Sequence, residues 1–435
     1  MSKKIYEEYL GYTLLKPIVD YTTRFSYRKA EVKGVENIPT DGAVIIAPNH
    51  CNTLMDALVI LRSFKGRKVF GARADMFNNK FIGKIMTFIR ILPMVRQRDG
   101  FRNVLKNHET TDIVVETLEH KVPFCIYPEG RHRPAHSLLP LGKGVFRAAL
   151  TANSKFGDKM PVYIVPTGIE YGDYFRYHST SLVTYGKAIN VTEFVKNHPV
   201  ESEAQLFEPL KKELREGMSE LITFIKDDEN LGVKWELTKM LARTTKAASC
   251  ALSDRMQRNK QIVSSIEKAC ESNPEATAEL FEKVKSFEKA RRKAGLSIYS
   301  FGKKNSWMSL AAKTLGAIAG LPYYLFSLIA ALPLWVTNTI LKKVIKDKAF
   351  RNTAAFGVKL GLGPFVFLMW TIPAFNLLAW PWALLISVGI IPAYGYFHDY
   401  NEYIRRYASD MRYLGHKDLK NRFKAIINEF NAILG

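Results

Sequence analysis

Two residues near the start of the chain have the types and spacing of a proton-transfer pair. His50 and Asp56 lie six positions apart in the segment Asn-His-Cys-Asn-Thr-Leu-Met-Asp, residues 49–56. A neutral imidazole can take a proton from an alcohol, and a carboxylate on its other ring nitrogen fixes the tautomer and stabilises the imidazolium. The pair therefore has the chemistry of a general base for acyl transfer to a hydroxyl. Alone it is weak support, because such residues are also common as plain polar groups of loops.

An apolar run directly before this segment predicts the element that positions the histidine. Residues 43–47 read Ala-Val-Ile-Ile-Ala, between Asp41-Gly42 and Pro48. A continuous run of this kind is typical of a strand buried on both faces. The strand would place His50 at its end and Asp56 in the start of a helix. Helix neighbours that share a face lie three or four positions apart, so a turn must bring the two side chains together.

Three later segments place polar residues after strand-like runs in the same way. They are residues 91–98, which close with Arg96 and Arg98; Tyr-Pro-Glu-Gly-Arg at 127–131, after the apolar run 122–126; and Val-Pro-Thr-Gly at 165–168, which ends the run 162–165. With the first segment, this ordered set resembles the four sequence blocks of the glycerolipid acyltransferases, the family of lysophosphatidic acid acyltransferase. Order, separation and strand context agree over roughly residues 30–190. The four blocks together are specific, whereas no single block would be.

The family pattern is Asn-His-x4-Asp, a block that ends in arginine, Phe-Pro-Glu-Gly-Thr-Arg-Ser, and Val-Pro-Val, and this chain departs from it twice. Five residues separate His50 from Asp56 instead of four, a spacing also found in some glycerol-3-phosphate acyltransferase branches. The third block continues as Arg131-His132-Arg133, so a histidine stands at the arginine position. Whether Arg131 or Arg133 contacts phosphate is left open.

The resemblance implies a fold and a set of roles. The fold class is α/β, with a mixed sheet covered by helices, followed by a helical region and C-terminal membrane helices. His50 would deprotonate the acceptor while Asp56 orients it, and the hydroxyl would attack the thioester of acyl-CoA or acyl carrier protein without a Cys51 intermediate. Glu129 would bind a glycerol hydroxyl or order an arginine. The residues implied in holding the acceptor are Arg96, Arg98, Glu129, Gly130, Arg131 and Arg133.

Arginine suits an acceptor phosphate because its planar fork donates two hydrogen bonds and keeps its charge. Lys143 is a further candidate, because it follows a glycine at an expected helix start, and helix N-termini bind anions. A plain loop-to-helix junction explains it equally well. The sequence predicts no metal site, because no cluster of metal ligands is visible, and it predicts no cofactor.

The composition favours an anionic partner. The chain has 63 Lys and Arg against 41 Asp and Glu, a formal net charge of +22. Nucleic acid and acidic lipid both fit such a charge, but no RNA-binding signature or zinc spacing is present, so we expect anionic membrane lipid and no nucleic acid. The four cysteines show no framework spacing, which predicts free thiols in a reducing compartment.

Two C-terminal segments without charged residues, 315–341 and 360–397, predict a membrane part. The first exceeds the roughly 20 residues of one span, while the second is too long for one span and too short for two. Basic residues flank every end, and positive charge marks the cytoplasmic side. Two hairpins bent at prolines satisfy this best; one span followed by a hairpin is the alternative, and a buried soluble domain fits least. The prolines are Pro322, Pro333, Pro364, Pro373, Pro381 and Pro392.

These patterns predict five parts. Residues 1–29 form an amphipathic helix that lies at the membrane interface or packs as core, and 30–200 form the acyltransferase domain. Residues 201–306 are helical, 307–400 are membrane-embedded, and 401–435 form a polar helical tail.

The predicted function is a membrane-bound acyltransferase of phospholipid biosynthesis, with its catalytic domain on the cytoplasmic face. The expected acceptor is 1-acylglycerol-3-phosphate (lysophosphatidic acid), which gives phosphatidic acid, and glycerol-3-phosphate is the alternative. A catalytically inactive lipid-binding protein on the same scaffold is the competing class. The presence of His50, Asp56 and Glu129 argues against it.

Overall fold

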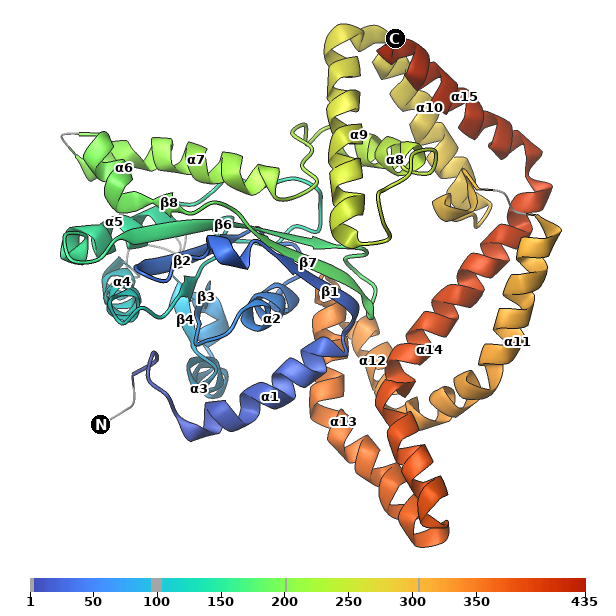
Figure 1. Cartoon of the computed structure of the whole chain (residues 1–435), viewed down its shortest axis with the longest axis horizontal. Helices are drawn as coiled ribbons and strands as arrows, with labels where there is room; N and C mark the ends of the chain where they lie inside the picture. The colour runs from blue at the N-terminus through green and yellow to red at the C-terminus, as the bar shows by residue number, and fades with distance from the viewer. Residues whose placement is uncertain (1–3, 95–103, 200–201, 304–305) are drawn as a thin grey trace. The chain divides into compact units, whose positions relative to one another are not determined.

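The computed structural model describes residues 4–94, 104–199, 202–303 and 306–435 (Figure 1). The chain divides into two units. The first unit holds Met1–Phe175, Ser179–Ile222 and Asp347–Thr353, and the second holds Arg176–His178, Thr223–Lys346 and Ala354–Gly435. A short piece of the C-terminal half therefore belongs to the unit that contains His50.

The first unit is built on a mixed sheet, which has eight strands in the part of the chain that the structure describes. The order is β1-β7-β6-β2-β5-β3-β4, and β8 pairs with β6. The strands are β1 (Tyr27–Lys33), β2 (Ala43–Pro48), β3 (Val69–Arg73), β4 (Ile91–Met94), β5 (Phe124–Cys125), β6 (Val162–Tyr171), β7 (Ser179–Tyr185) and β8 (Ile189–Asn190). Pairing is parallel except for β6 with β7 and β6 with β8. The predicted mixed sheet is confirmed.

Helices cover this sheet (Figure 1). Helix α7 lies above it in that view and α1 and α2 lie below it, while α4 and α5 pack against β2. The helices of this unit are α1 (Leu10–Arg24), α2 (Leu54–Ser63), α3 (Lys80–Phe88), α4 (Val104–Glu119), α5 (Gly144–Phe156), α6 (Val191–Asn197) and α7 (Phe207–Glu220).

The central strand β2 is buried along its whole length, as its apolar run predicted. It pairs in parallel with β5 through Ile46 and Cys125 and with β6 through Pro48 and Thr167. The carboxyl ends of β2 and β5 therefore lie at one edge of the sheet, beside the middle of β6. The residues that follow β2 and β5 meet at this edge.

Two strand predictions need correction. The run 122–126 forms only the short strand β5, Phe124–Cys125. The run 162–165 does not end at Val165, because β6 continues to Tyr171. Its second half pairs antiparallel with β7, Thr167 opposite Tyr185, so a tertiary neighbour extends the strand past Pro166.

The N-terminal segment was predicted either to lie at the membrane interface or to pack as core, and helix α1 has features of both. Its buried residues, Tyr12, Thr22 and Thr23, pack inward. On the other side, the side chains of Leu10, Leu14, Ile18 and Tyr21 are 48–72% exposed. One face of the helix is core, and an apolar stripe on the other face is uncovered.

The second unit is helical. Its helices are α8 (Leu231–Leu241), α9 (Leu252–Ser272), α10 (Pro274–Lys293), α11 (Trp307–Ala330), α12 (Leu332–Val344), most of α13 (Phe350–Leu377), α14 (Trp380–Gly415) and α15 (Lys417–Leu434). Helices α8, α9, α10 and α15 share a core that includes Leu237, Ile266, Phe287 and Phe423. Pro274 opens α10 directly after Asn273, where α9 has ended.

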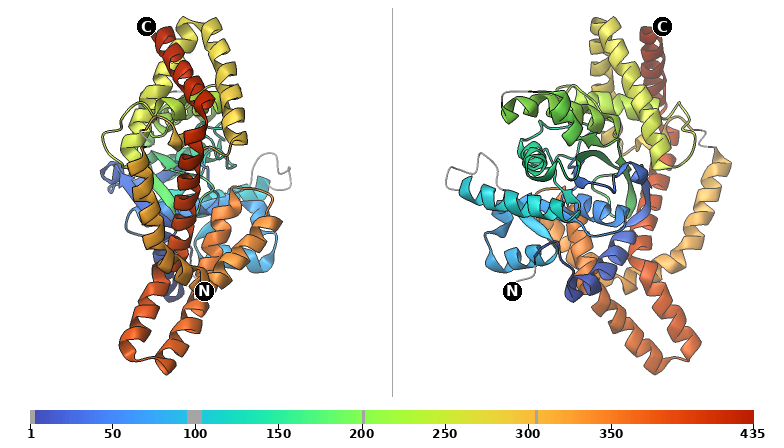
Figure 2. Two further views of the ribbon diagram at one scale, coloured as in Figure 1. Left: turned by 90° about the vertical axis from the view of Figure 1, so that its right-hand side faces the viewer. Right: turned by 60° about the vertical axis from the view of Figure 1, so that its left-hand side comes forward.

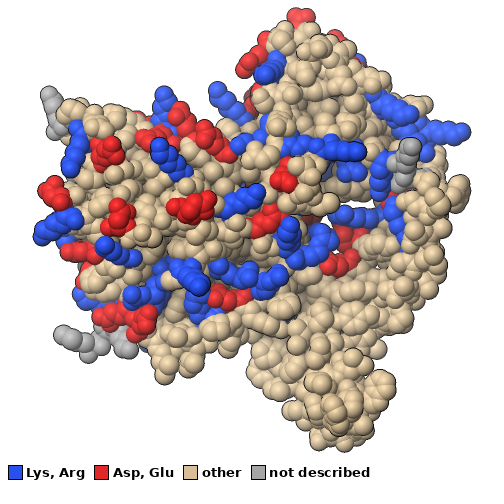
Figure 3. Space-filling view, viewed as in Figure 1, with Lys and Arg blue, Asp and Glu red and all other residues tan. Residues whose placement is uncertain are grey.

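Three helices among the described residues, α11, α13 and α14, have the length and hydropathy needed to cross a bilayer. The views in Figure 2 show α13 and α14 as the two arms of a hairpin. The face of this hairpin end that Figure 3 shows has no charged side chain, and residues 360–397 contain none. Phe365 on α13 and Leu385 on α14 are 70% and 61% exposed. This apolar surface is what a helix pair in lipid presents.

The apolar segments were predicted to bend at their prolines, and only two of the six prolines lie at a bend. The first segment breaks at Ala331, and the second breaks between Leu377 and Trp380. Pro333 and Pro381 lie in the first turn after each break, where a missing N–H leaves no hydrogen bond unmade. The others lie inside helices: Pro322 in α11, Pro364 and Pro373 in α13, and Pro392 in α14.

Candidate active site

His50 and Asp56 are in direct contact at the carboxyl edge of the sheet. His50 Nδ1 lies 2.8 Å from Asp56 Oδ2. The side chain of Asp56 is fully buried, whereas that of His50 is 18% exposed. The predicted turn therefore brings the two residues together, with the carboxylate inside and the imidazole at the surface of the site.

Asp56 is held by donors on both of its oxygens. Oδ2 accepts hydrogen bonds from the backbone N–H groups of Cys51 at 2.8 Å and Asn52 at 2.7 Å. Oδ1 accepts a hydrogen bond from the Tyr171 hydroxyl at 2.8 Å. Asp56 also lies in the first turn of α2, where the helix dipole favours a negative charge. These interactions offset the cost of burying a carboxylate and fix its orientation.

This arrangement sets the tautomer of His50. A carboxylate at Nδ1 places a hydrogen on that nitrogen and leaves the lone pair on Nε2. The imidazole stacks on the Tyr127 ring with centroids 4.2 Å apart, and it meets the His132 ring edge-on at 5.8 Å. The ring is therefore held on several sides, and its second nitrogen is suited to accept a proton.

Thr53, the residue before α2, has a strained backbone in the turn between His50 and Asp56. Its φ is 48°, a left-handed conformation that β-branched residues rarely adopt. The amide of Asp56 donates to the Thr53 carbonyl at 3.3 Å, and that of Met55 donates to the Asn52 carbonyl at 3.0 Å. The five residues between His50 and Asp56 thus form a tight turn with local backbone strain, as is common at functional sites.

Glu129 ties the third block to this turn. Its Oε1 accepts from the backbone N–H of His50 at 2.9 Å, and its Oε2 accepts from that of Leu139 at 2.7 Å. Burial raises the pKa of Glu129, and the two backbone hydrogen bonds partly oppose this rise. Both oxygens are engaged with backbone, so the observed contacts of Glu129 hold the loops around His50.

The neighbours of Glu129 lie at different depths. Gly130 has a φ of 63° and closes a turn onto the Tyr127 carbonyl. The Arg133 amide donates to the His50 carbonyl at 2.9 Å, and its guanidinium donates to Ser137 Oγ at 2.5 Å. Arg131 is exposed. Arg133 is thus bonded to the backbone of the site, while Arg131 is at the protein surface.

Lys143 precedes α5, as predicted, and its side chain is exposed. Its Nζ lies 5.7 Å from the centre of the Phe207 ring. The adjacent Gly142 amide donates to the Pro128 carbonyl at 2.7 Å, which links this loop to the third block. Arg96 and Arg98 lie outside the described residues; β4, the strand before them, ends at Met94.

Cys51 lies beside His50 but is buried, with 1% exposure. Burial, and next the negative charge of Asp56, raise the pKa of its thiol well above the usual range. A thiol must ionise to act as a nucleophile. The environment of Cys51 therefore opposes a covalent role, in line with the prediction. All four cysteines are free in the structure.

Sequence reasoning missed two contributors to the site. Tyr171 was missed because the third apolar run was expected to end at Val165; extending the strand would have found it. Asp347, whose Oδ2 lies 2.8 Å from His132 Nε2, has no sequence signal, since 215 positions separate the two residues.

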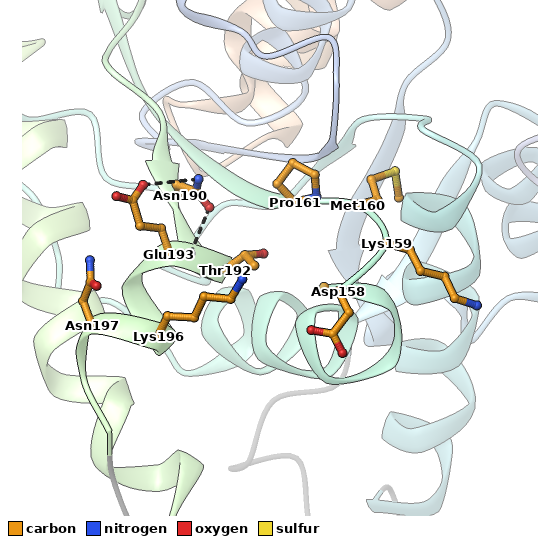
Figure 4. Close-up of a pocket in the computed structure, with 10 residues that line it drawn as sticks. Asp158, Lys159, Met160, Pro161, Asn190, Thr192, Glu193, Lys196 and Asn197 are labelled. Carbon is orange, nitrogen blue, oxygen red and sulfur yellow. Dashed lines mark hydrogen bonds between the residues drawn. The ribbon is translucent and has the colours of Figure 1, made fainter.

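A cavity of about 370 Å³ lies elsewhere in the first unit (Figure 4). Asp158, Lys159, Pro161, Asn190 and Lys196 are among its lining residues. Pro161 precedes the first residue of β6, whereas His50 follows Pro48, which pairs with Thr167 further along β6. The cavity is thus at the opposite edge of the sheet from His50. Among the described residues, no group of three or more His, Cys, Asp or Glu is arranged to hold a metal ion.

Comparisons with known proteins found matches in sequence and in structure. Residues 29–170 match the family model described as Acyltransferase. The chain is 32% identical over 114 residues to Glycerol-3-phosphate O-acyltransferase 2 of Saccharomyces cerevisiae, a match that spans 25% of this chain and 15% of that protein. It is also similar to a solved structure, the 1-acyl-sn-glycerophosphate (LPA) acyltransferase PlsC of Thermotoga maritima. That similarity has 20% identity and a TM-score of 0.34, and it covers 48% of this chain and 79% of the other.

Proposed function

We propose, from the match of residues 29–170 to the family model described as Acyltransferase, that this chain is a membrane-bound O-acyltransferase. It transfers a fatty acyl group from a thioester donor to a hydroxyl of a glycerol-phosphate acceptor. The observation that carries the proposal is the 2.8 Å contact between His50 Nδ1 and the buried Asp56 carboxylate. This contact leaves Nε2 as the proton acceptor that such a reaction needs.

The reaction follows from this geometry. His50 Nε2 takes the hydroxyl proton as the acceptor oxygen attacks the thioester carbonyl carbon. The carbon–oxygen bond forms, the carbon–sulfur bond breaks, and the imidazolium returns the proton to the departing thiolate. Asp56 stabilises the imidazolium between these two transfers. The raised pKa of Cys51 supports direct transfer without an acyl-enzyme intermediate.

The acceptor's phosphate is recognised by the basic side chains of the second and third blocks together with Lys143. Arg133 is the described arginine whose backbone is bonded to His50, and Arg96, Arg98, Arg131 and Lys143 complete the proposed set. Charge-assisted hydrogen bonds from arginine match the geometry of phosphate oxygens. The proposed donor is acyl-CoA or acyl carrier protein, because both present the required thioester.

Two acceptors fit this site. The first candidate is 1-acylglycerol-3-phosphate, which gives phosphatidic acid. Glycerol-3-phosphate is the second, favoured by the five-residue gap between His50 and Asp56 and by the 32% identity to a glycerol-3-phosphate acyltransferase. Both acceptors present a hydroxyl near a phosphate, so the chemistry at His50 is the same.

The membrane location is supported by surfaces in both units. Helices α11, α13 and α14 are long and apolar enough to span a bilayer. In the first unit, Tyr9 at the start of α1 contacts Phe88 of α3, with ring centroids 5.5 Å apart. On α3 the side chains of Phe81, Ile82 and Ile85 are exposed, like the stripe on α1. We propose that these two helices rest on the cytoplasmic leaflet, whose anionic lipids attract a basic protein.

The decisive experiment offers both acceptors to the purified full chain in detergent. Acyl-CoA and acyl-loaded acyl carrier protein, each radiolabelled in the acyl chain, serve as donors, with glycerol-3-phosphate and lysophosphatidic acid in parallel. Label transfer to either acceptor supports the proposal, and the preferred acceptor decides between the two candidates. A folded preparation that binds anionic vesicles but transfers no label from either donor would instead support the inactive lipid-binding protein.

A further inference from the structure

The segment Asp347–Thr353 belongs to the catalytic unit, although in sequence it lies between the two apolar segments. It packs against the turn that carries His50 and Asp56. Thr353 Oγ1 lies 2.7 Å from Thr53 Oγ1, and Asn352 Nδ2 donates to the Tyr174 carbonyl at 2.7 Å. Ala349 is 1% exposed. The segment therefore packs directly against the residues that form the candidate active site.

This segment fixes the ring of His132. Asp347 Oδ2 lies 2.8 Å from His132 Nε2. The His132 ring meets the Phe350 ring edge-on at 5.5 Å and the His50 ring at 5.8 Å. Among the described residues, His132 Nδ1 makes no hydrogen bond. One ring nitrogen is thus anchored to the segment, while the other is available beside the catalytic base.

The negative charge of Asp347 is stabilised by hydrogen bonds from the Ala349 amide and from His132. Its Oδ1 accepts a hydrogen bond from the Ala349 amide at 2.9 Å, at the start of α13. The Ala349 amide, and next the hydrogen bond with His132, lower the pKa of Asp347. The positive end of the α13 dipole also favours a carboxylate at this position. A carboxylate at Nε2 accepts a hydrogen bond from that nitrogen and so fixes the orientation of the His132 ring.

We propose that Asp347 is a positioning residue of the acyl-transfer site, holding His132 as an imidazolium whose Nδ1–H binds the acceptor phosphate. The inference rests on the proposed function. His132 lies between Arg131 and Arg133, at the position where the family pattern has arginine. An imidazolium donates hydrogen bonds from both ring nitrogens, so it can contact a carboxylate and a phosphate at the same time. Asp347 supplies this carboxylate from the linker that begins α13.

The role of Asp347 can be separated from its capping of α13 by changing His132 as well. Asp347→Ala should raise the KM for the acceptor about 10-fold, the lower range expected for losing a hydrogen bond to a charged group, with the donor KM unchanged. In a His132→Arg background the same substitution should leave the acceptor KM unchanged, because arginine keeps its charge without a carboxylate. Lys346→Ala, at an exposed position outside the segment Asp347–Thr353, is the control and should behave like wild type.

Each outcome of this experiment is informative. The full chain is assayed with whichever of glycerol-3-phosphate and lysophosphatidic acid it acylates. An unchanged acceptor KM in Asp347→Ala would overturn the inference, as would an equal rise in both backgrounds, which would mean that Asp347 only caps α13. The proposed function fails separately, namely if wild type transfers no acyl group or if His50→Ala keeps full activity. If wild type is active and His50→Ala is inactive, the proposed function holds, and the Asp347 variants then test the role of Asp347 alone.

Discussion

Tyr171, near the far end of β6, donates its hydroxyl hydrogen to Asp56 Oδ1 across 2.8 Å inside the sheet edge. The strand that was expected to stop at Val165 thus reaches the carboxylate that orients His50. Burial, and next the charge of Asp56, raise the pKa of Tyr171 well above the usual range, so the phenol stays protonated and remains a donor. Strand β6, through Tyr171, therefore helps to fix the orientation of the Asp56 carboxylate in the proposed catalytic pair.

Tyr171→Phe removes this donor while keeping the aromatic ring. We expect kcat to fall about 10-fold and the chain to lose about 1–2 kcal/mol of stability, because a buried carboxylate oxygen loses a hydrogen bond. Steady-state kinetics and thermal unfolding in detergent measure the two effects. The matched control is Tyr163→Phe, which removes an exposed hydrogen bond to Asp41. Equal behaviour of the two variants would show that the contact with Asp56 has no special role.

His50→Ala tests the base itself. The imidazole lies at the surface of the site and Asp56 keeps its other donors, so the fold should persist. Loss of a general base lowers kcat about 100- to 10,000-fold. His198→Ala, at an exposed histidine after α6, is the control and should retain wild-type turnover. Near-normal turnover by His50→Ala would remove this residue from the mechanism.

Arg96 carries a prediction made from sequence alone, since it lies outside the described residues. Arg96→Ala should raise the KM for the acceptor, because a charge-assisted contact with phosphate is lost. Arg96→Lys should restore only part of the affinity, since lysine lacks the planar fork. Kinetics with varied acceptor and varied donor separate the two sites, and Lys159→Ala in the distant cavity is the control. Weaker donor binding with unchanged acceptor dependence would assign Arg96 to the donor.

The local parts of the site followed from the sequence, and the distant parts did not. The apolar run before Pro48 predicted the buried strand β2, and the spacing of His50 and Asp56 required the turn that is observed. Both features depend on residues close in sequence. The length of β6 depends on its pairing with β7, and the contact between His132 and Asp347 joins residues 215 positions apart. No local pattern encodes such a contact, because only the folded chain brings its partners together.

The last prediction concerns the membrane topology. If the two apolar segments form hairpins, then the linker before α13 and the tail after α14 both face the cytoplasm. Basic residues in both regions favour this, because positive charge resists transfer across the bilayer.

Lys346→Cys and Lys417→Cys place thiols at exposed positions of these two regions. The background replaces Cys250 and Cys270 by serine and keeps Cys51 and Cys125, which are buried. An impermeant thiol reagent should label neither site on intact cells and both sites after permeabilisation, with the cysteine-replaced background as the control. Labelling of either site from outside would exclude the two-hairpin arrangement, and labelling of Lys417→Cys alone would favour an odd number of spans between the linker and the tail.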